Sequence, residues 1–149
     1  MPHFGLMDTR DSFEKPEGAL LRARLHIRGG KRRLRQRKIS AGIVTLYDAL
    51  LFALRWYAFS PEHRNTLGIT LKDALSDEKR VFELIKSAGI FPVDFDYDEF
   101  DTLVEKALAD EMPDYDYSGM LIDFEAFMTV LGVMPFNESE LPPEDPATF

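Results

Sequence analysis

A run of apolar residues in the first half of the chain limits the possible folds more than any other feature of the sequence. From 39 to 59 the sequence reads ISAGIVTLYDALLFALRWYAF, which places apolar side chains around nearly the whole circumference of a helix. Such a helix lies at the centre of a folded protein or crosses a membrane. Because Asp48 and Arg55 would be costly inside a bilayer, we predict a buried central helix and no membrane partner. The N-terminus carries no recognisable signal peptide, so the expected location is cytoplasmic.

Helical periodicity and capping signals continue on both sides of this segment. Asp96, followed by Glu99, is typical of a helix N-terminus. Apolar residues then recur at the spacing of one helix face, in Phe100, Leu103, Val104, Ala107 and Leu108. We therefore predict an all-α fold, a compact bundle of about five helices with short turns. The expected organisation is an irregular segment at 1–16, one bundle domain at 17–132 and a flexible, acidic, proline-rich tail at 133–149.

The segment from 19 to 38 has two possible interpretations. Apolar residues alternate with basic ones from 21 to 28, which is the period of a strand, and Gly29-Gly30 could then turn a hairpin. Ala, Leu and Arg are strong helix formers, however, and the same residues also give a helical stripe. We favour a helix that ends at Gly29 or Gly30 in a left-handed cap, and the hairpin stays as the alternative.

The composition removes several kinds of chemistry. The chain has no cysteine and three histidines, so we expect neither disulfides nor a cysteine-ligated zinc, and a histidine-rich metal site is disfavoured. Phosphate-binding glycine loops and nucleophile motifs are also absent from the sequence. Asp48 is the one polar oddity of the central helix and could be a buried carboxylate with a raised pKa, although a structural role is favoured. We predict no catalytic residue and no cofactor.

Charge is divided sharply between the two halves of the chain. Residues 1–74 carry a net charge of about +7 and residues 75–149 about −15, within an overall charge of −8. Between 94 and 125, twelve acidic residues accompany only Lys106. The basic segment could bind the phosphates of a nucleic acid, or it could pair with the acidic half. The candidate nucleic-acid-binding residues are Arg28, Lys31, Arg32, Arg33, Arg35, Arg37 and Lys38.

A second candidate site lies at 114–125, in the sequence DYDYSGMLIDFE. It resembles the calcium loop of an EF-hand, in which oxygen ligands alternate, a glycine occupies position 6 and a glutamate position 12. Pro113 precedes the loop and Ile122 occupies position 9, and both depart from that pattern. An acidic joint between two helices is the alternative interpretation. The candidate metal ligands are Asp114, Asp116, Ser118 and Glu125.

The order of segments from Ala19 to Ile85 resembles the higher-eukaryote-and-prokaryote nucleotide-binding (HEPN) domain. The segments are LLRARLHIRGG, then AGIVTLYDALLFALRWYAF, then a capped helix. The resemblance implies an antiparallel pair of long helices and dimerisation. Many members cleave RNA with an arginine followed four to six residues later by a histidine. Here Arg55 and His63 are farther apart and Ser60-Pro61 lies between them, so the resemblance does not extend to ribonuclease activity.

These observations favour a non-catalytic protein-interaction or oligomerisation module that acts as a homodimer or binds another protein. The first alternative is a nucleotide- or nucleic-acid-binding module that uses the basic segment 28–38. The second alternative is a calcium-binding helix–loop–helix at 114–125. A hydrolase built around Asp48 and the acids of 94–101 is the least favoured of the possibilities.

Overall fold

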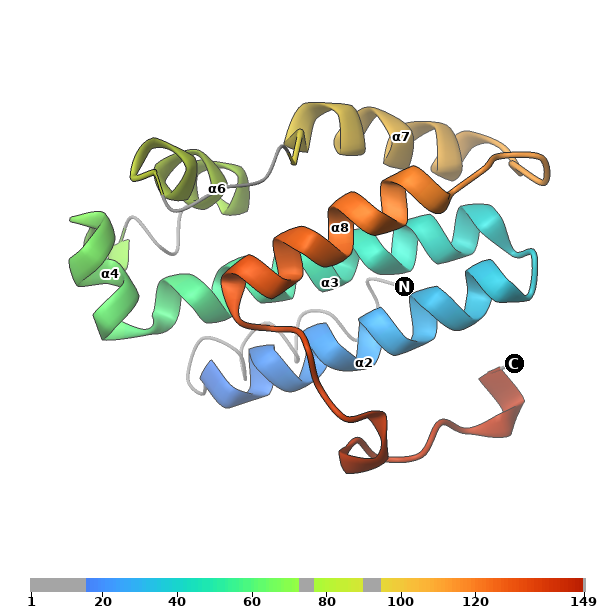
Figure 1. The fold of residues 1–149 in the computed structure, drawn as a ribbon, viewed down its shortest axis with the longest axis horizontal. Helices are drawn as coiled ribbons and strands as arrows, with labels where there is room; N and C mark the ends of the chain where they lie inside the picture. The colour runs from blue at the N-terminus through green and yellow to red at the C-terminus, as the bar shows by residue number, and fades with distance from the viewer. Residues whose placement is uncertain (1–15, 73–76, 90–94, 149) are drawn as a thin grey trace.

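The computed structural model describes residues 16–72, 77–89 and 95–148, and these residues form an all-helical bundle, as the sequence predicts. The helices surround a single core, and the last segment of the chain crosses one side of the bundle (Figure 1). In chain order the helices are α2 (Pro16–Arg35), α3 (Ile39–Phe59), α4 (Pro61–Leu67), α6 (Glu78–Ser87), α7 (Tyr97–Ala109) and α8 (Ser118–Leu131), followed by the 3-10 turns η2 (Glu138–Glu140) and η3 (Pro146–Thr148).

Helices α2 and α3 form an antiparallel hairpin, which confirms the helical interpretation of 19–38 (Figure 1). The expected cap at Gly29 or Gly30 is wrong, because α2 continues through both glycines to Arg35. Gly30 instead allows close packing: a Cβ added there would lie 2.7 Å from Leu46 Cδ2. Gly42 faces it from α3, where an added Cβ would lie 2.8 Å from Leu34 Cδ2. The turn between the helices uses Arg37, whose φ is 64°.

Helix α3 is the centre of the bundle, and α2, α4, α6, α7 and α8 all pack against it. Its buried residues occur along its entire length, from Ile39 to Phe59, as an all-round apolar helix requires. By length and composition α3 could also cross a membrane, and 56% of its most apolar stretch is buried inside the protein. The apolar surface of α3 is thus largely used for packing within the chain.

Aromatic side chains join α6, α7 and α8 above this central helix. Phe127 of α8 stacks on Phe95 at 4.8 Å between ring centroids, and it meets Phe82 of α6 edge-on at 5.6 Å. The predicted cap of α7 is confirmed, since the Asp96 carboxylate accepts a hydrogen bond from the backbone N–H of Glu99. These ring contacts hold α6, α7 and α8 over α3 without close packing between the three helices themselves.

The C-terminal segment after Gly132 was expected to be an irregular tail. In the structure it forms η2 and η3 and lies across α2 (Figure 1). Val133 is fully buried, and its carbonyl accepts a 2.9 Å hydrogen bond from Arg24 Nε. The physical reason is that α2 presents several arginines whose guanidinium groups bind the tail's carbonyl and carboxylate oxygens. The expected irregular segment at 1–16 lies outside the described residues except for Pro16, which begins α2.

Candidate functional site

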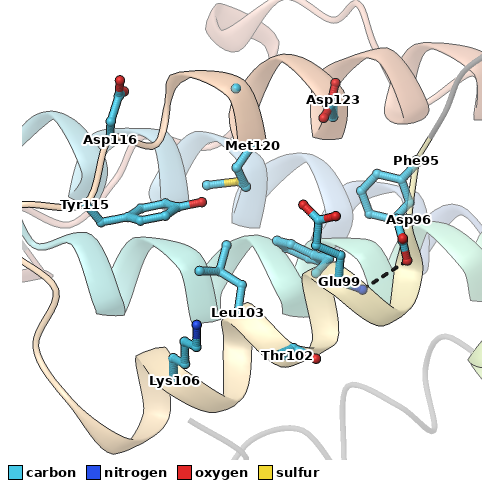
Figure 2. Close-up of a pocket in the computed structure, with 12 residues that line it drawn as sticks. Phe95, Asp96, Glu99, Thr102, Leu103, Lys106, Tyr115, Asp116, Met120 and Asp123 are labelled. Carbon is cyan, nitrogen blue, oxygen red and sulfur yellow. Dashed lines mark hydrogen bonds between the residues drawn. The ribbon is translucent and has the colours of Figure 1, made fainter.

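A groove of about 630 Å³ runs between α7 and α8. Both helices pack against α3 more extensively than against each other, so a furrow is left between them. Figure 2 shows side chains from the two helices facing each other across this space. The groove is lined by Phe95, Asp96, Glu99, Phe100, Thr102, Leu103, Lys106, Tyr115, Asp116, Gly119, Met120 and Asp123.

The floor of the groove is apolar. Phe95 and Phe100 are buried there, and their ring centroids lie 5.7 Å apart across the start of α7. Leu103 and Met120 are partly buried and face each other from α7 and α8 (Figure 2). The ring of Tyr115 lies across one end of the groove (Figure 2). This floor offers apolar surface that the described part of the chain leaves uncovered.

The rim of the groove is acidic. Among the described residues that line it, four are carboxylates and Lys106 is the only basic one. The Glu99 carboxylate points into the groove, whereas that of Asp116 is turned outward (Figure 2). Burial raises the pKa of Tyr115, and the negative charges of Glu99 and Asp116 raise it further. The groove therefore combines an apolar floor with a negative electrostatic potential.

Local hydrogen bonds position two of the rim carboxylates. Asp96 caps α7 through the backbone N–H of Glu99 at 3.0 Å, and Figure 2 shows this bond. Asp116 Oδ1 accepts hydrogen bonds from both the backbone N–H and the hydroxyl of Ser118, at the start of α8. These bonds lower the pKa of Asp116, so the carboxylate stays ionised at neutral pH. Two of the four rim carboxylates are thus held at the N-terminal ends of α7 and α8.

The basic segment lies in part against the C-terminal half of the chain. Lys31 Nζ is 2.8 Å from Glu125 Oε2, and Arg32 Nε is 2.9 Å from Glu144 Oε2. Arg28 and Arg33 lie beside Glu144 in the same region of α2. Arg37 is exposed and donates to the carbonyl of Pro113. Arg35 and Lys38 are also exposed, at the end where α2 meets α3.

The structure does not bring the predicted calcium ligands together. Helix α8 begins at Ser118, the fifth position of the supposed loop, so Glu125 lies about 10 Å farther along the helix axis. Glu125 is turned toward Lys31 of α2 rather than toward Asp116. Asp114 is exposed in the turn before α8. Among the residues described here, no group of three or more acidic or histidine side chains is arranged to hold a metal ion.

Asp48 is a half-buried carboxylate on α3, as its sequence context suggests. Its Oδ2 atom is buried and has no hydrogen-bond partner within the described ranges, and burial raises the pKa of Asp48 to about 6. The groove lies elsewhere, so Asp48 takes no part in it.

Sequence reasoning misses the groove as a site. It assigns Asp96 and Glu99 to capping and places Asp116 in a calcium loop, so Lys106, Tyr115 and Met120 are never grouped with them. The sequence feature that could have indicated the groove is the high density of acidic residues from 94 to 125, interrupted by aromatic residues. No family model, curated protein or solved structure shows significant similarity to this chain. The resemblance to the HEPN domain therefore stays a prediction.

Proposed function

We propose that this protein is a non-catalytic interaction module whose α7–α8 groove binds a basic, amphipathic helical segment of a partner protein. The observation that carries the proposal is the combination of an apolar floor, left uncovered by the residues that the structure describes, with a rim of four carboxylates. An amphipathic helix would place its apolar stripe on Leu103, Met120 and Tyr115. Its lysine or arginine side chains would then reach the carboxylates of Glu99 and Asp123.

The length of the groove sets the size of the occupant. The lining residues of α7 extend from Asp96 to Lys106, which corresponds to about 15 Å along a helix axis. About three turns of a docked helix would fill that length. Rim ion pairs are each worth only about 0–1 kcal/mol, so charge would mainly accelerate and orient binding while the apolar floor supplies affinity.

The test is binding of a fluorescently labelled helical peptide of about 14 residues, with leucines at helical spacing and lysines elsewhere. We expect fluorescence anisotropy to show saturable binding to the full chain. The double variant Glu99→Lys/Asp123→Lys should weaken binding by about tenfold. The double variant Glu105→Lys/Glu111→Lys is the matched control, because it changes the net charge by the same amount at two exposed residues that do not line the groove.

Three outcomes would contradict the proposal. The first is that the peptide does not bind the wild-type chain. The second is that Glu105→Lys/Glu111→Lys weakens binding as much as Glu99→Lys/Asp123→Lys, which would indicate general charge attraction. The third is that a scrambled peptide of the same composition binds equally well, since the apolar stripe would then be irrelevant.

Self-association stays as a second possibility for the same kind of module. The prediction of a homodimer rested partly on the all-round apolar surface of α3, and much of that surface is covered by other helices of the same chain. Light scattering at tens of micromolar protein tests this directly. A dimer that dissociates in Glu99→Lys/Asp123→Lys would identify a second copy as the occupant of the groove.

Nucleic-acid binding by 28–38 has weaker support. Lys31 and Arg32 already pair with carboxylates of the chain, which leaves Arg35, Arg37 and Lys38 as the exposed basic corner. Filter binding of RNA and DNA at low salt tests this alternative. Retention that is lost on changing those exposed residues to glutamine would favour it over the groove.

A further inference from the structure

A second, small cavity lies on the opposite side of the hairpin from the groove, where the C-terminal segment crosses α2. Its volume is about 220 Å³, and its lining includes Arg28, Gly29, Arg32, Arg33 and Glu144. Clefts for drug-sized ligands are usually larger than about 300 Å³, so the size suits a small group. Three arginines from two successive turns of one helix therefore line a small, shallow pocket that is open to solvent.

The arginines are held in place by burial and by the tail. Arg32 is a buried residue, 7% exposed, and the side chain of Arg28 is 11% exposed. Arg28 Nη2 donates to the carbonyl of Pro142 at 2.7 Å, and Arg32 Nη1 donates to Gln36 Oε1 at 3.1 Å. Guanidinium groups fixed in this manner lose little conformational freedom when an anion binds.

Gly29 creates room beneath the cluster. A Cβ added to Gly29 would lie 3.1 Å from Arg33 Nη1 and 3.9 Å from Glu144 Oε2. Because glycine has no side chain, the guanidinium groups can gather directly over the helix backbone. This explains a glycine in the middle of α2 at a position that does not face α3.

The carboxylate of Glu144 provides hydrogen-bond acceptors for only part of this arginine cluster. Its Oε2 atom lies 2.9 Å from Arg32 Nε, but its Oε1 atom is 3.8 Å from Arg28 Nε, too far for a hydrogen bond. Arg28 Nε is consequently buried with no hydrogen-bond partner among the residues that the structure describes. Burial, and then the charge of Arg32, lower the pKa of Arg33, while Glu144 opposes that shift. The Asp145 carboxylate also lines the pocket, and its Oδ1 atom accepts from the N–H of Ala147. Three guanidinium groups therefore face two carboxylates here, so the cluster keeps a net positive charge and a buried donor, Arg28 Nε, for an added anion.

We propose that Arg28, Arg32 and Arg33 form a binding site for a phosphate monoester, and that Glu144 occupies this site when the ligand is absent. A phosphate carries up to two negative charges and more acceptor oxygens than a carboxylate, so it can accept from Arg28 Nε and Arg32 Nε together. Binding would displace the Glu144 carboxylate from Arg32, while the hydrogen bond from Arg28 to the Pro142 carbonyl could remain. The site is separate from the α7–α8 groove, so this proposal does not depend on the proposed function.

The first experiment is calorimetric titration of inorganic phosphate into the full chain at low ionic strength. We expect Glu144→Gln to bind phosphate about tenfold more tightly than the wild type, because the competing charge is removed. The matched control is Glu138→Gln, which removes an exposed carboxylate of the same tail outside the cavity. NMR resonances of the Nε–H groups of Arg28 and Arg32 should shift as phosphate is added.

A second pair of variants tests the arginines in the Glu144→Gln background. Arg28→Gln should weaken phosphate binding by about tenfold, whereas Arg35→Gln, on the same helix but outside the cavity, should change it less than about twofold. Circular dichroism confirms that each variant is folded before it is titrated. Adenosine monophosphate and phosphoserine, tested beside inorganic phosphate, distinguish a nucleotide from a phosphorylated amino acid and from the free ion.

The proposal is overturned if Glu144→Gln binds neither inorganic phosphate nor either ester. It is also overturned if Glu138→Gln tightens binding as much as Glu144→Gln, or if Arg35→Gln weakens it as much as Arg28→Gln. Either of those results would assign the effect to overall charge rather than to the cavity.

Discussion

The α2–α3 hairpin and the α7–α8 pair show two ways in which helices of one chain are arranged. In the hairpin, Gly30 and Gly42 allow the helices to approach until an added Cβ on either would overlap a leucine of the other. In the α7–α8 pair, both helices rest on α3 and leave an acidic groove between them. Small residues at a crossing thus give a closed interface, while large aromatic residues beneath two helices keep them apart and leave surface for a ligand.

The largest effect on stability is expected beneath the groove. Phe127 is fully buried and touches the rings of both Phe82 and Phe95. Phe127→Ala should lower the free energy of unfolding in urea by about 3–5 kcal/mol, because it removes apolar contacts and leaves a cavity. Ile122→Ala, at a position 67% exposed on the same helix, should change it by less than about 0.5 kcal/mol. Similar losses at both positions would mean that the aromatic cluster does not anchor α8.

The closed interface of the hairpin should not accommodate even one added methyl group. Gly42→Ala should lower the free energy of unfolding by about 1–2 kcal/mol, since overpacking outweighs the gain of about 1 kcal/mol in helix propensity. Chemical denaturation monitored by the single tryptophan, Trp56, measures this change. A stabilised Gly42→Ala protein would show that the hairpin is looser than the structure indicates.

The stability of the protein is expected to depend on pH through Asp48, which lies on α3. Its pKa in the folded chain, about 6, is above the ordinary value of 3.8, so the folded state binds the proton more tightly. Stability should therefore fall as pH rises from about 4 to about 6 and stay lower above that range. Asp48→Asn should remove this slope and, after allowance for partial exposure, stabilise the protein at pH 7 by about 1 kcal/mol. Asp114→Asn, at an exposed acid, is the control and should leave the slope unchanged.

The smallest effect is expected at Gly119, in the first turn of α8 beside the groove. No atom lies within 4 Å of a Cβ added there. Gly119→Ala should raise the free energy of unfolding by about 0.5–1 kcal/mol through helix propensity alone. Its sign should be opposite to that of Gly42→Ala in the same denaturation assay. A matching loss of stability at both glycines would remove the contrast between the open and closed interfaces.

Helix positions could be predicted from the sequence because their signals are local. The apolar run from 39 to 59, the cap at Asp96 and the left-handed glycine at Gly132 each act within a few residues. The end of α2 could not be predicted, because Gly29 and Gly30 have roles set by tertiary contacts with Glu144 and Leu46. From local sequence alone, a pair of glycines indicates the end of a helix rather than a site of close helix packing.

The candidate sites were harder to predict, because they depend on which charges meet across the fold. That basic and acidic segments would pair was one of the expected alternatives, and Lys31 with Glu125 agrees with it. The involvement of Glu144 was not expected, because a proline-rich acidic tail is typical of mobile sequence. The groove depends on how α7 and α8 are spaced on α3, and that spacing has no signature in the sequence of either helix.

The short turn at 36–38 has a consequence for how the chain folds. It joins the two helices with the most extensive contact in the bundle, so those contacts form with little loss of loop-closure entropy. We expect the α2–α3 hairpin to be ordered early and to serve as the template on which α7 and α8 assemble. Mutations at Leu34 and Leu46 should then slow folding, whereas those at Phe127 should mainly accelerate unfolding. The groove would be among the last features to form, and stopped-flow kinetics of these variants measure that order.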